Sequence, residues 1–526
     1  MAFSFNDLED LFKVGEYYPH PNHEDRIMRY KYNRRLFKNE DVKEIYSTYA
    51  DQLTRDHGNL LYIAVNFPGL ICKKSADFLF GETPVFSAGR GSDSPEQKKL
   101  DEYIKQNGLH KLNYMAALSA AYRGDAFYKI RWGQKYEGAL PPSVDPFRIF
   151  IELQNPEYVF PQAFPTDATK IAVYHVAYPV QVDEQRWELY VESHYPGLIK
   201  YRRFLLDPLI HDSKLNEIVQ WKITQELTPP MDPVNTGVPH PLIVHVPNTQ
   251  LDDVWEGVDD LSEHLPLFEA INVRISAIGA ILDKHADPLL VVPAGSLAED
   301  ENGNPTFVPG RDKVIEVMDN KEVIPQYVTW DGQLQAAFEH LKHLIDKLLM
   351  TAELPPVALG GENTGTSGST SLAVKLRMNS LISKINRKRQ FFDEGLKRVI
   401  TIAQMLEQQA LKKKGESLGF EIFEPHITFA DGLPKDDLEQ AQIEAVRLGG
   451  KAFSSLKAVL MRHYGYTEEQ AEEEIKRIEE DETRGMVIKG PLDDKFIPGI
   501  DAEKEDSTDD GGTANAMKAK ARQGDA

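Results

Sequence analysis

One segment sets the organisation of this chain: Leu354-Pro355-Pro356-Val357-Ala358-Leu359-Gly360-Gly361-Glu362-Asn363-Thr364-Gly365-Thr366-Ser367-Gly368-Ser369. Its apolar leading part gives way to glycine, serine and threonine, and helical periodicity flanks it on both sides. A long loop inside a compact region is usually either functional or disordered. Periodic helices flank this segment on both sides, so we do not interpret it as a mere linker. We interpret residues 352–368 as a functional loop.

The segments around this loop are mostly helical. Apolar residues recur three or four apart over 259–285 and again over 331–351, as two amphipathic helices require. Residues 286–330 break that period and contain two short strand candidates around a turn. After the loop, 369–412 is predicted to form one helix of about 65 Å, longer than a small domain is wide. We therefore expect this helix to cross between lobes or subunits.

The predicted long helix is basic in an acidic chain. The formal net charge is −22, yet no acidic residue occurs from Asn363 to Phe392. Six basic residues occur there: Lys375, Arg377, Lys384, Arg387, Lys388 and Arg389. We expect them to form a basic face that meets either DNA or an acidic neighbouring subunit, and we favour the neighbour.

The first half of the chain, residues 1–258, mixes helix and strand signals. Helices are predicted over 41–80, with a break at Pro68-Gly69, and over 97–122. Alternation of apolar and polar residues predicts strands over 126–132, 147–152, 170–180, 186–195, 198–205, 217–226 and 242–246. This half is therefore predicted to be an α+β lobe. Near the other end, helices are predicted at about 435–449 and 453–482, and the composition beyond 485 is typical of disorder.

Composition narrows the class of protein. A length of 526 residues suggests roughly three or four lobes. The negative net charge opposes tight wrapping on nucleic acid or adsorption to an anionic membrane, since both need a positive face. The single cysteine, Cys72, cannot form an internal disulfide. With no hydrophobic leader and no apolar run of about 18 residues, the sequence favours a reducing cytoplasm.

No catalytic, cofactor-binding or metal-binding set stands out. The glycine-rich loop lacks the Gly-Lys-Ser/Thr ending of a phosphate-binding loop, so ATPase activity is not expected. His340 and His343 have no clear partner set, and we expect a structural role for them. Cys72 is expected to be a buried apolar residue. The pair Asp259-Asp260 stands at a helix start, where capping explains it better than acid–base catalysis.

Several motifs, in order over about residues 25–482, resemble those of phage portal proteins. The run Ala121-Tyr122-Arg123-Gly124-Asp125-Ala126-Phe127-Tyr128-Lys129 resembles the family's helix-to-strand step, and Pro156-Glu157-Tyr158-Val159-Phe160-Pro161 resembles its following loop. Asp259-Asp260-Leu261, the two helices around their excursion, the glycine-rich loop and Ile427-Thr428-Phe429-Ala430-Asp431-Gly432-Leu433-Pro434 then follow in the family's order. The order is most similar to that in portals of long-tailed phages of Gram-positive hosts.

The resemblance implies an α+β portal fold, mostly helical in its second half and assembled as a ring. By analogy, the parts would be a wing at 1–258, stem helices at 259–285 and 331–351, a clip at 286–330, a tunnel loop at 352–368, a long wing helix with a return strand at 369–430, a crown at 431–484 and a disordered tail at 485–526. The residues that the tunnel loop would turn toward DNA are Val357, Ala358, Leu359, Gly360, Gly361, Asn363 and Thr364. Such small, uncharged residues can touch DNA without the phosphate binding that would stall it.

The resemblance also implies a function without chemistry of its own. Portals form a ring of about twelve subunits at one capsid vertex, through which double-stranded DNA is packaged and later ejected. The implied partners are other copies of the chain, the terminase large subunit, the major capsid protein, the scaffolding protein, a head-completion adaptor and the DNA. No cofactor, metal, catalytic residue or membrane is implied, and the protein would assemble in the host cytoplasm and reside in the virion.

Two other classes remain open. The first is another phage scaffold or head–tail adaptor without a DNA channel. The second is an enzyme of nucleic-acid processing, which would need a carboxylate cluster for metal ions or a nucleotide loop. Neither of those features stands out in the sequence.

Overall fold

A computed structural model describes residues 8–41, 45–46, 62–91, 93–212, 217–286, 289–293, 314–317, 326–328, 334–360, 375–430, 455–463 and 471–480. The chain divides into two compact units, Met1–Asp437 and Leu438–Ala526. Three predictions lie outside the described residues: the helix at 435–449, the tail at 485–526 and loop residues 361–368. Helix and strand are mixed, which confirms the predicted fold class.

Four named helices lie in the described N-terminal part of the first unit. They are α1 (Pro21–Lys38), α4 (Phe67–Phe80), α5 (Pro95–Asn107) and α6 (Leu109–Arg123). The predicted helix 97–122 is two helices, because Gly108 takes a left-handed conformation (φ 58°) between α5 and α6. Of the predicted helix 41–80, residues 62–66 are not helical, and α4 starts at Phe67, where the Asn66 side chain accepts a hydrogen bond from the Gly69 amide at 2.8 Å.

Helix α1 was not predicted from the sequence, because part of its buried face is polar. His23, Arg26 and Asn33 are all buried there alongside Ile27 and Leu36. Apolar periodicity, on which the helix predictions depend, is therefore weak in this segment.

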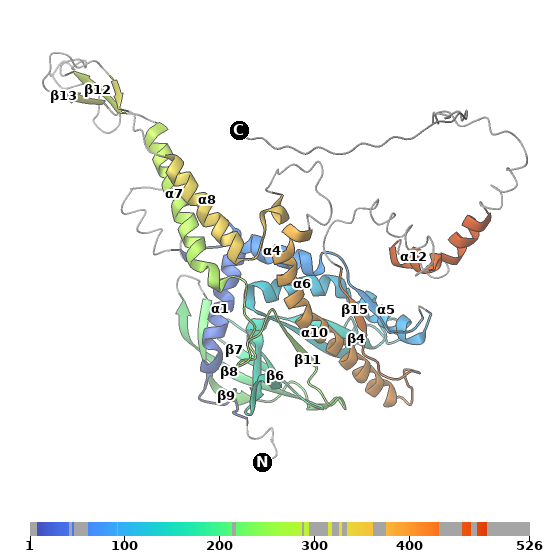
Figure 1. The fold of residues 1–526 in the computed structure, drawn as a ribbon. Coiled ribbons are helices and arrows are strands. Elements are labelled where there is room, and N and C mark those ends of the chain that lie inside the picture. Colours follow the sequence, from blue (N-terminus) through green and yellow to red (C-terminus); the bar gives the residue numbers. More distant parts are fainter. Residues whose placement is uncertain are drawn as a thin grey trace, which may run out of the picture. The chain divides into compact units, whose positions relative to one another are not determined.

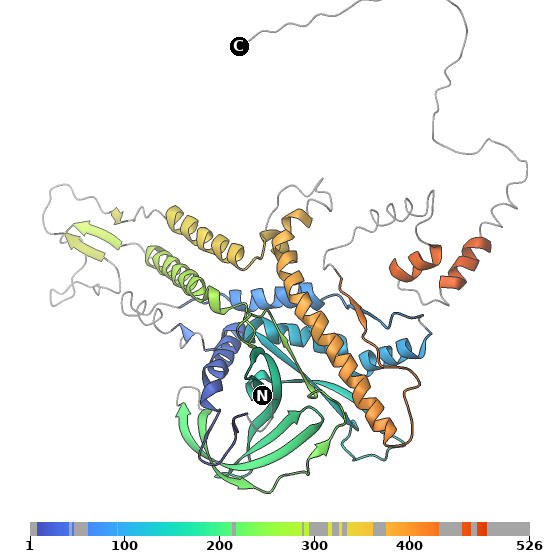
Figure 2. The ribbon, with the colours of Figure 1, turned by 60° about the horizontal axis from the view of Figure 1, so that its bottom comes forward.

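A large antiparallel sheet follows, in the order β1-β9-β8-β7-β6-β5 with β10 paired to β8. Figure 2 shows it as a curved layer. Its strands are β1 (Tyr17–Tyr18), β5 (Val159–Phe164), β6 (Asp167–Gln181), β7 (Trp187–Tyr195), β8 (Leu198–Asp212), β9 (Glu217–Leu227) and β10 (Val234–Asn235). The predicted strands at 170–180, 186–195, 198–205 and 217–226 are confirmed, although β8 runs to Asp212. The sequence analysis missed β5.

A smaller sheet carries the resemblance motif around Gly124. Its order is β11 (Ile243–Pro247), β3 (Asp125–Gly133) and β4 (Arg148–Gln154), which confirms the other three predicted strands. Gly124 ends α6 with φ 96°, and a Cβ there would lie 2.3 Å from the Gly257 carbonyl oxygen. Only glycine fits this conformation and this close approach, so the helix-to-strand step depends on it. A further pair joins β2 (Val85–Ser87) to β15 (His426–Thr428).

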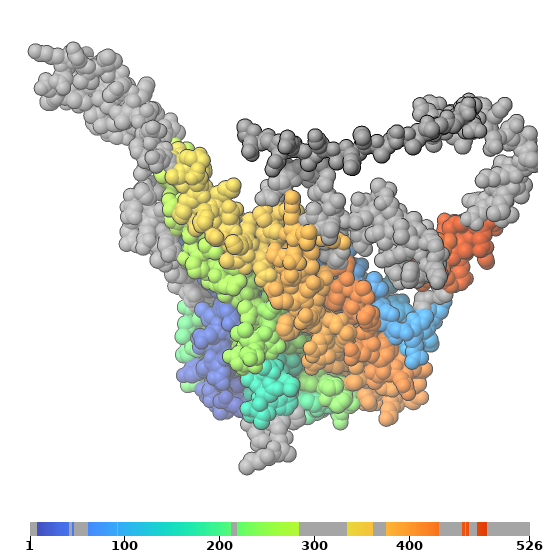
Figure 3. Space-filling view, in the orientation of Figure 1, coloured from blue at the N-terminus to red at the C-terminus, as the bar shows by residue number. Residues whose placement is uncertain are grey.

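Two long helices form a hairpin with a small sheet between them in sequence. After η3 (Ser262–His264), α7 (Leu265–Ala286) packs along α8 (Leu334–Thr351) (Figure 1). Between them, β12 (Leu289–Pro293) pairs in parallel with β13 (Val314–Val317) and antiparallel with β14 (Gln326–Val328). The sequence predicts β12 and β13, whereas β14 was missed. In the space-filling view, α7 and α8 lie side by side (Figure 3).

Contrary to the sequence expectation, one helical segment, Ser262–Leu282, is long and apolar enough to cross a membrane by length and composition. It carries polar side chains that the fold uses. Asn272 accepts a hydrogen bond from the Val65 amide at 3.0 Å, and Ser276 accepts one from the Ile63 amide at 2.9 Å. Both side chains are buried, so one face of this segment packs against protein.

The long helix is shorter than predicted. α10 (Asn379–Lys412) has 34 residues, or about 51 Å, and 375–377 form a separate helical turn before Met378. α10 contacts α4 and all three strands of the smaller sheet. One face of α10 therefore packs within the first unit. That the helix crosses between lobes or subunits stays a prediction. The second unit has helices at Leu456–His463 (α12) and 471–480.

Candidate functional site

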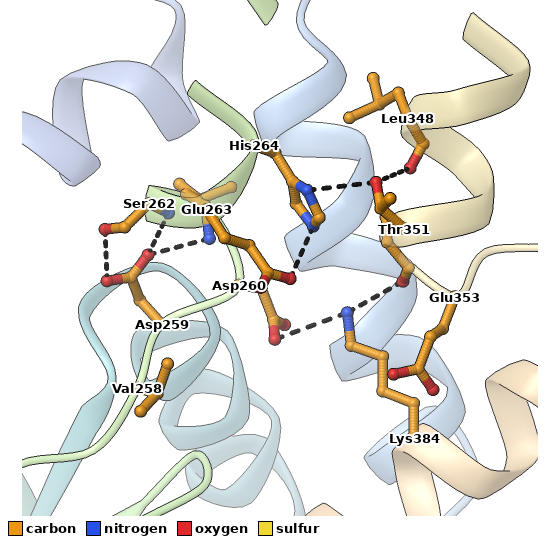
Figure 4. A network of polar contacts seen from close by, with 12 residues as sticks. Val258, Asp259, Asp260, Ser262, Glu263, His264, Leu348, Thr351, Glu353 and Lys384 are labelled. Carbon is orange, nitrogen blue, oxygen red and sulfur yellow. Dashed lines mark hydrogen bonds and ion pairs between the residues drawn. The ribbon is translucent and has the colours of Figure 1, made fainter. Parts of the chain in front are cut away.

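Three segments that the sequence analysis treated separately meet at the base of the hairpin. They are residues 259–264 before α7, residues 351–353 at the end of α8, and the first turns of α10 (Figure 4). The glycine-rich loop starts from the same place. This joint is the candidate site because it links the hairpin, the loop and the long helix.

Asp260 is the centre of the joint. Its carboxylate is buried and accepts a hydrogen bond from Lys388 Nζ, while Lys384 Nζ lies 3.5 Å from its Oδ1. Ser75 Oγ donates to its Oδ2 at 2.9 Å, and Asn248 Nδ2 donates to its Oδ1 at 3.1 Å. One carboxylate therefore ties α10 to α4 and to the segment after β11.

Burial and the neighbouring charges shift the pKa values of Asp260 and Lys388 in opposite directions. Burial alone would raise the pKa of Asp260, but the ammonium groups of Lys384 and Lys388 hold that pKa well below its usual range. Burial lowers the pKa of Lys388 to about 8 in spite of the nearby carboxylate. Asp260 is therefore ionised at neutral pH, and its negative charge offsets part of the free-energy cost of burying the ammonium groups of Lys384 and Lys388.

The second cation has a further acceptor at the end of α8. Lys384 Nζ donates to the Ala352 carbonyl at 3.1 Å, one residue beyond the helix. Carbonyl groups at a helix C-terminus lack partners within the helix and carry partial negative charge. Lys384 therefore caps α8 at the point where the chain enters the loop.

The two ends of the hairpin are also joined directly. Asp259 accepts hydrogen bonds from the amides of Leu261 and Ser262 at 2.9 and 2.7 Å, which confirms its predicted capping role. Asp260 has a different role from the one predicted, since it is a buried counter-ion. His264 Nδ1 lies 3.4 Å from the Thr351 hydroxyl, so side chains from both ends of the hairpin are in contact.

The apolar part of the predicted tunnel loop is packed on the protein. Val357, Ala358 and Leu359 lie in a short 3₁₀ helix, η4 (Pro356–Leu359), and are half-buried against the main hydrophobic core. Gly360 ends this turn with φ 72°. The remaining predicted loop residues, Gly361, Asn363 and Thr364, lie outside the described residues.

The structure separates the six predicted basic residues. Lys375 and Arg377 are exposed before α10, and Arg387 is exposed with its guanidinium 2.5 Å from Glu353. Arg389 donates to the carbonyl oxygens of Phe78, at 3.3 Å, and of Ala430. The prediction of a single exposed basic face is therefore wrong for Lys384 and Lys388, because both are buried.

The reason for this error is the period of the helix. Lys384 and Lys388 are four residues apart and share the buried face of α10 with Leu381, Ile385 and Phe392. Their counter-ion is far away in sequence, 128 residues from Lys388. A local scan for acidic residues could not find it, although two lysines within an apolar helical stripe are a signal that a buried carboxylate is needed.

The other singled-out residues have structural surroundings. Cys72 is fully buried, as predicted, and burial raises the pKa of its thiol. His340 and His343 are exposed on α8. Within the described ranges, no group of three His, Cys, Asp or Glu residues is placed to hold a metal ion. The segments of the joint are held together by buried charges, which are costly to separate.

Comparisons with known proteins cover most of the chain. The profile of one protein family, described as phage portal protein, SPP1 Gp6-like, matches residues 19–486. Among solved structures, the chain is similar to one described as "Neck of native GTA particle computed with C12 symmetry". That likeness has 10% sequence identity and a TM-score of 0.36, and it covers 78% of this chain and 92% of that chain. No curated protein matches.

Proposed function

We propose, since this chain belongs to the SPP1 Gp6-like family of phage portal proteins, that it forms a closed ring of about twelve subunits at one vertex of the capsid. Portal proteins are structural components of the virion, and this chain is one of them. The proposed ring is the channel through which double-stranded DNA enters during packaging and leaves during ejection. The family match over residues 19–486 carries this proposal.

The parts of the fold take the following roles in the proposal. Residues 1–258 and the long helix with its return strand, 369–430, form the wing, α7 and α8 form the stem, and the sheet within 286–330 is the clip. The clip docks the terminase large subunit and later the head-completion adaptor. The wing and the crown, residues 431–484, meet the major capsid protein and the scaffolding protein, and 485–526 is a tail.

The joint around Asp260 supports a mechanical role. It connects the stem helices to the long helix of the wing by buried charges and by the contact of Lys384 with the Ala352 carbonyl. Because η4 is packed on the core, we propose that the part of the loop that contacts DNA begins after Gly360. The joint then fixes the position from which that loop extends toward the channel.

The first test is the mass and symmetry of the purified protein. Native mass spectrometry should give a closed ring of about twelve subunits, and end views in the electron microscope should show a central hole. A monomer or dimer at high concentration would contradict the ring. A ring without a hole would favour the alternative, a head–tail adaptor without a DNA channel.

A second test separates the channel from the assembly. Asn363→Asp combined with Thr364→Glu adds negative charge to the loop without touching the packed residues of η4. We expect normal rings and reduced DNA packaging in a packaging assay, because added carboxylates repel phosphate. Asn363→Gln with Thr364→Ser is the uncharged control. Equal packaging by the two variants would remove the loop from the proposed channel.

A further inference from the structure

The chain makes a strained turn where α8 ends and the predicted tunnel loop begins. Glu353 takes the left-handed backbone conformation there, with φ 56°. Its amide donates to the Met350 carbonyl at 3.2 Å, and the Leu354 amide donates to the Leu349 carbonyl at 2.8 Å. These two bonds form a Schellman motif, which usually has glycine at the left-handed position because other residues are strained in it. Strain of this kind points to a role for the residue beyond the turn itself.

The side chain of Glu353 contacts the long helix. Its carboxylate accepts a hydrogen bond from the Arg387 guanidinium of α10 at 2.5 Å. Arg387 is exposed and Glu353 is half-buried, and an exposed ion pair adds little to stability, so stability alone does not explain the glutamate. Glycine could make the same turn without strain, but it would also leave the backbone free to adopt other conformations. The glutamate instead ties the turn to α10.

The segment after Glu353 is stiff. Leu354 is buried and precedes a proline, which restricts its backbone. The rings of Pro355 and Pro356 fix their own φ angles, and that of Pro355 is −67°. The 3₁₀ helix η4 follows at once and ends at Gly360. The direction that the chain takes at Glu353 is therefore transmitted to the point from which the rest of the loop extends.

Two side chains of α10 hold consecutive residues at this turn. Lys384 donates to the Ala352 carbonyl at 3.1 Å, and Arg387, three residues further along α10, binds the Glu353 carboxylate. Lys384 is buried in the joint, whereas Arg387 is exposed outside it. The exposed contact acts on the residue at which the chain turns, and it can be removed without opening the buried joint.

We propose that Glu353 is a positioning residue of the loop: its ion pair with Arg387 sets the direction in which the chain leaves α8. The inference rests on the proposed function, in which the loop beyond Gly360 contacts DNA. It adds that one exposed ion pair with α10, rather than the hydrogen bonds of the turn alone, determines where that loop starts.

Amide hydrogen exchange of the full-length protein tests the positioning. A peptide covering 355–360 reports on η4, and one covering 344–354 reports on the end of α8. Arg387→Gln and Glu353→Gly should each speed exchange in 355–360 about two- to fivefold, the range expected for loss of an exposed ion pair. Exchange in 344–354 should stay within about twofold of wild type, because neither change removes the hydrogen bonds of the turn.

DNA packaging and a charge swap test the role. Glu353→Arg and Arg387→Glu should each form normal rings that package less DNA, because each places like charges side by side. The double variant restores the pair in reverse and should recover packaging, a rescue that a purely structural role of either residue does not predict. Asp393→Asn is the matched control, since it breaks the pair with Lys397 on the same helix, 2.6 Å apart, and should leave exchange in 355–360 and packaging unchanged.

Two results would overturn the inference. If Arg387→Gln and Glu353→Gly behave like Asp393→Asn in both assays, the ion pair positions nothing. If both single charge changes impair packaging and the swapped double variant does not recover it, the two residues act separately. Failure of the proposed function would appear in the wild type instead, as absence of a ring or of packaging, so the two failures are distinguishable.

Discussion

Replacing Asp260 by asparagine should loosen the base of the hairpin. The change keeps the shape of the side chain but removes the charge that Lys384 and Lys388 share. Removing one partner of a buried ion pair costs about 3–5 kcal/mol. Lys384 keeps the Ala352 carbonyl as an acceptor, so we expect the lower part of that range, about 3–4 kcal/mol.

Amide hydrogen exchange measures this loss locally, which suits a protein too large for a single unfolding free energy. Since each 1.36 kcal/mol is a tenfold change, peptides covering 261–272, 348–360 and 381–392 should exchange about a hundred to a thousand times faster. Asp259→Asn is the matched control. Its amide oxygen can still cap Leu261 and Ser262, at a cost below about 1 kcal/mol.

A double variant tests the cause. Asp260→Asn with Lys388→Met removes the stranded cation together with its partner, and it should recover much of the lost protection, because an apolar replacement of a buried pair is often neutral. The reasoning is refuted if Asp260→Asn changes exchange no more than Asp259→Asn. It is also refuted if the double variant exchanges as fast as Asp260→Asn alone.

Acidity offers an independent check on the same residue. The pKa of Asp260 is lower in the folded protein than in the unfolded chain, where it is about 3.9. Its stabilisation is therefore fully present above about pH 4 and is lost as the pH falls further, because the unfolded chain then binds a proton more readily. The exchange difference between wild type and Asp260→Asn should shrink below about pH 4. A difference that stays constant to pH 2 would argue against the charge.

Three further predictions concern other parts of the first unit. A Cβ at Gly395 would lie 2.4 Å from Val246 Cγ2, so Gly395→Ala should destabilise the folded protein by about 1–3 kcal/mol and lower its thermal midpoint. Adding Val246→Ala to Gly395→Ala should restore part of that midpoint. An unchanged midpoint in Gly395→Ala would contradict the packing of α10 on β11. Burial lowers the pKa of His175 to about 3, so between pH 7 and pH 5 only the unfolded chain gains this proton and stability should fall by about 2 kcal/mol. Followed by amide hydrogen exchange of β6, this pH dependence should be weaker in His175→Gln but not in the exposed His340→Gln. Equal pH dependence in all three proteins would count against a neutral buried His175. The buried Cys72 should resist a thiol reagent in the native protein and react faster in Asp260→Asn, whereas rapid native labelling would place the thiol at the surface.

The parts of the fold that the sequence predicted well are those with regular patterns. Alternation located seven strands, and the periodic apolar residues of α7 and α8 located the hairpin. α1 was missed because polar residues such as Arg26 occupy part of its buried face, where Arg26 donates to the carbonyls of Pro156 and Val159. Partners from distant segments determined that face, and a window of neighbouring residues does not contain them.

The candidate site was predictable in place but not in detail. The loop, the Asp259-Asp260 pair and the basic helix were each singled out, and all three meet at the joint. Their connection was not visible, because Lys388 and Asp260 are 128 residues apart. The basic segment was therefore interpreted as a surface, while the structure places two of its lysines inside.

The polar nature of the joint has a consequence for its role. An apolar contact of the same size tolerates sliding between helices, because hydrophobic attraction is non-directional. Asp260 instead accepts from Ser75, Asn248 and Lys388 in fixed directions, so a shift of α10 along the hairpin would strand a buried charge. The hairpin of α7 and α8 and the helix α10 must therefore move together or separate completely. Under the proposed function, the joint is then a rigid base at the point where the loop begins, and the two proposed stem helices keep their position relative to α10.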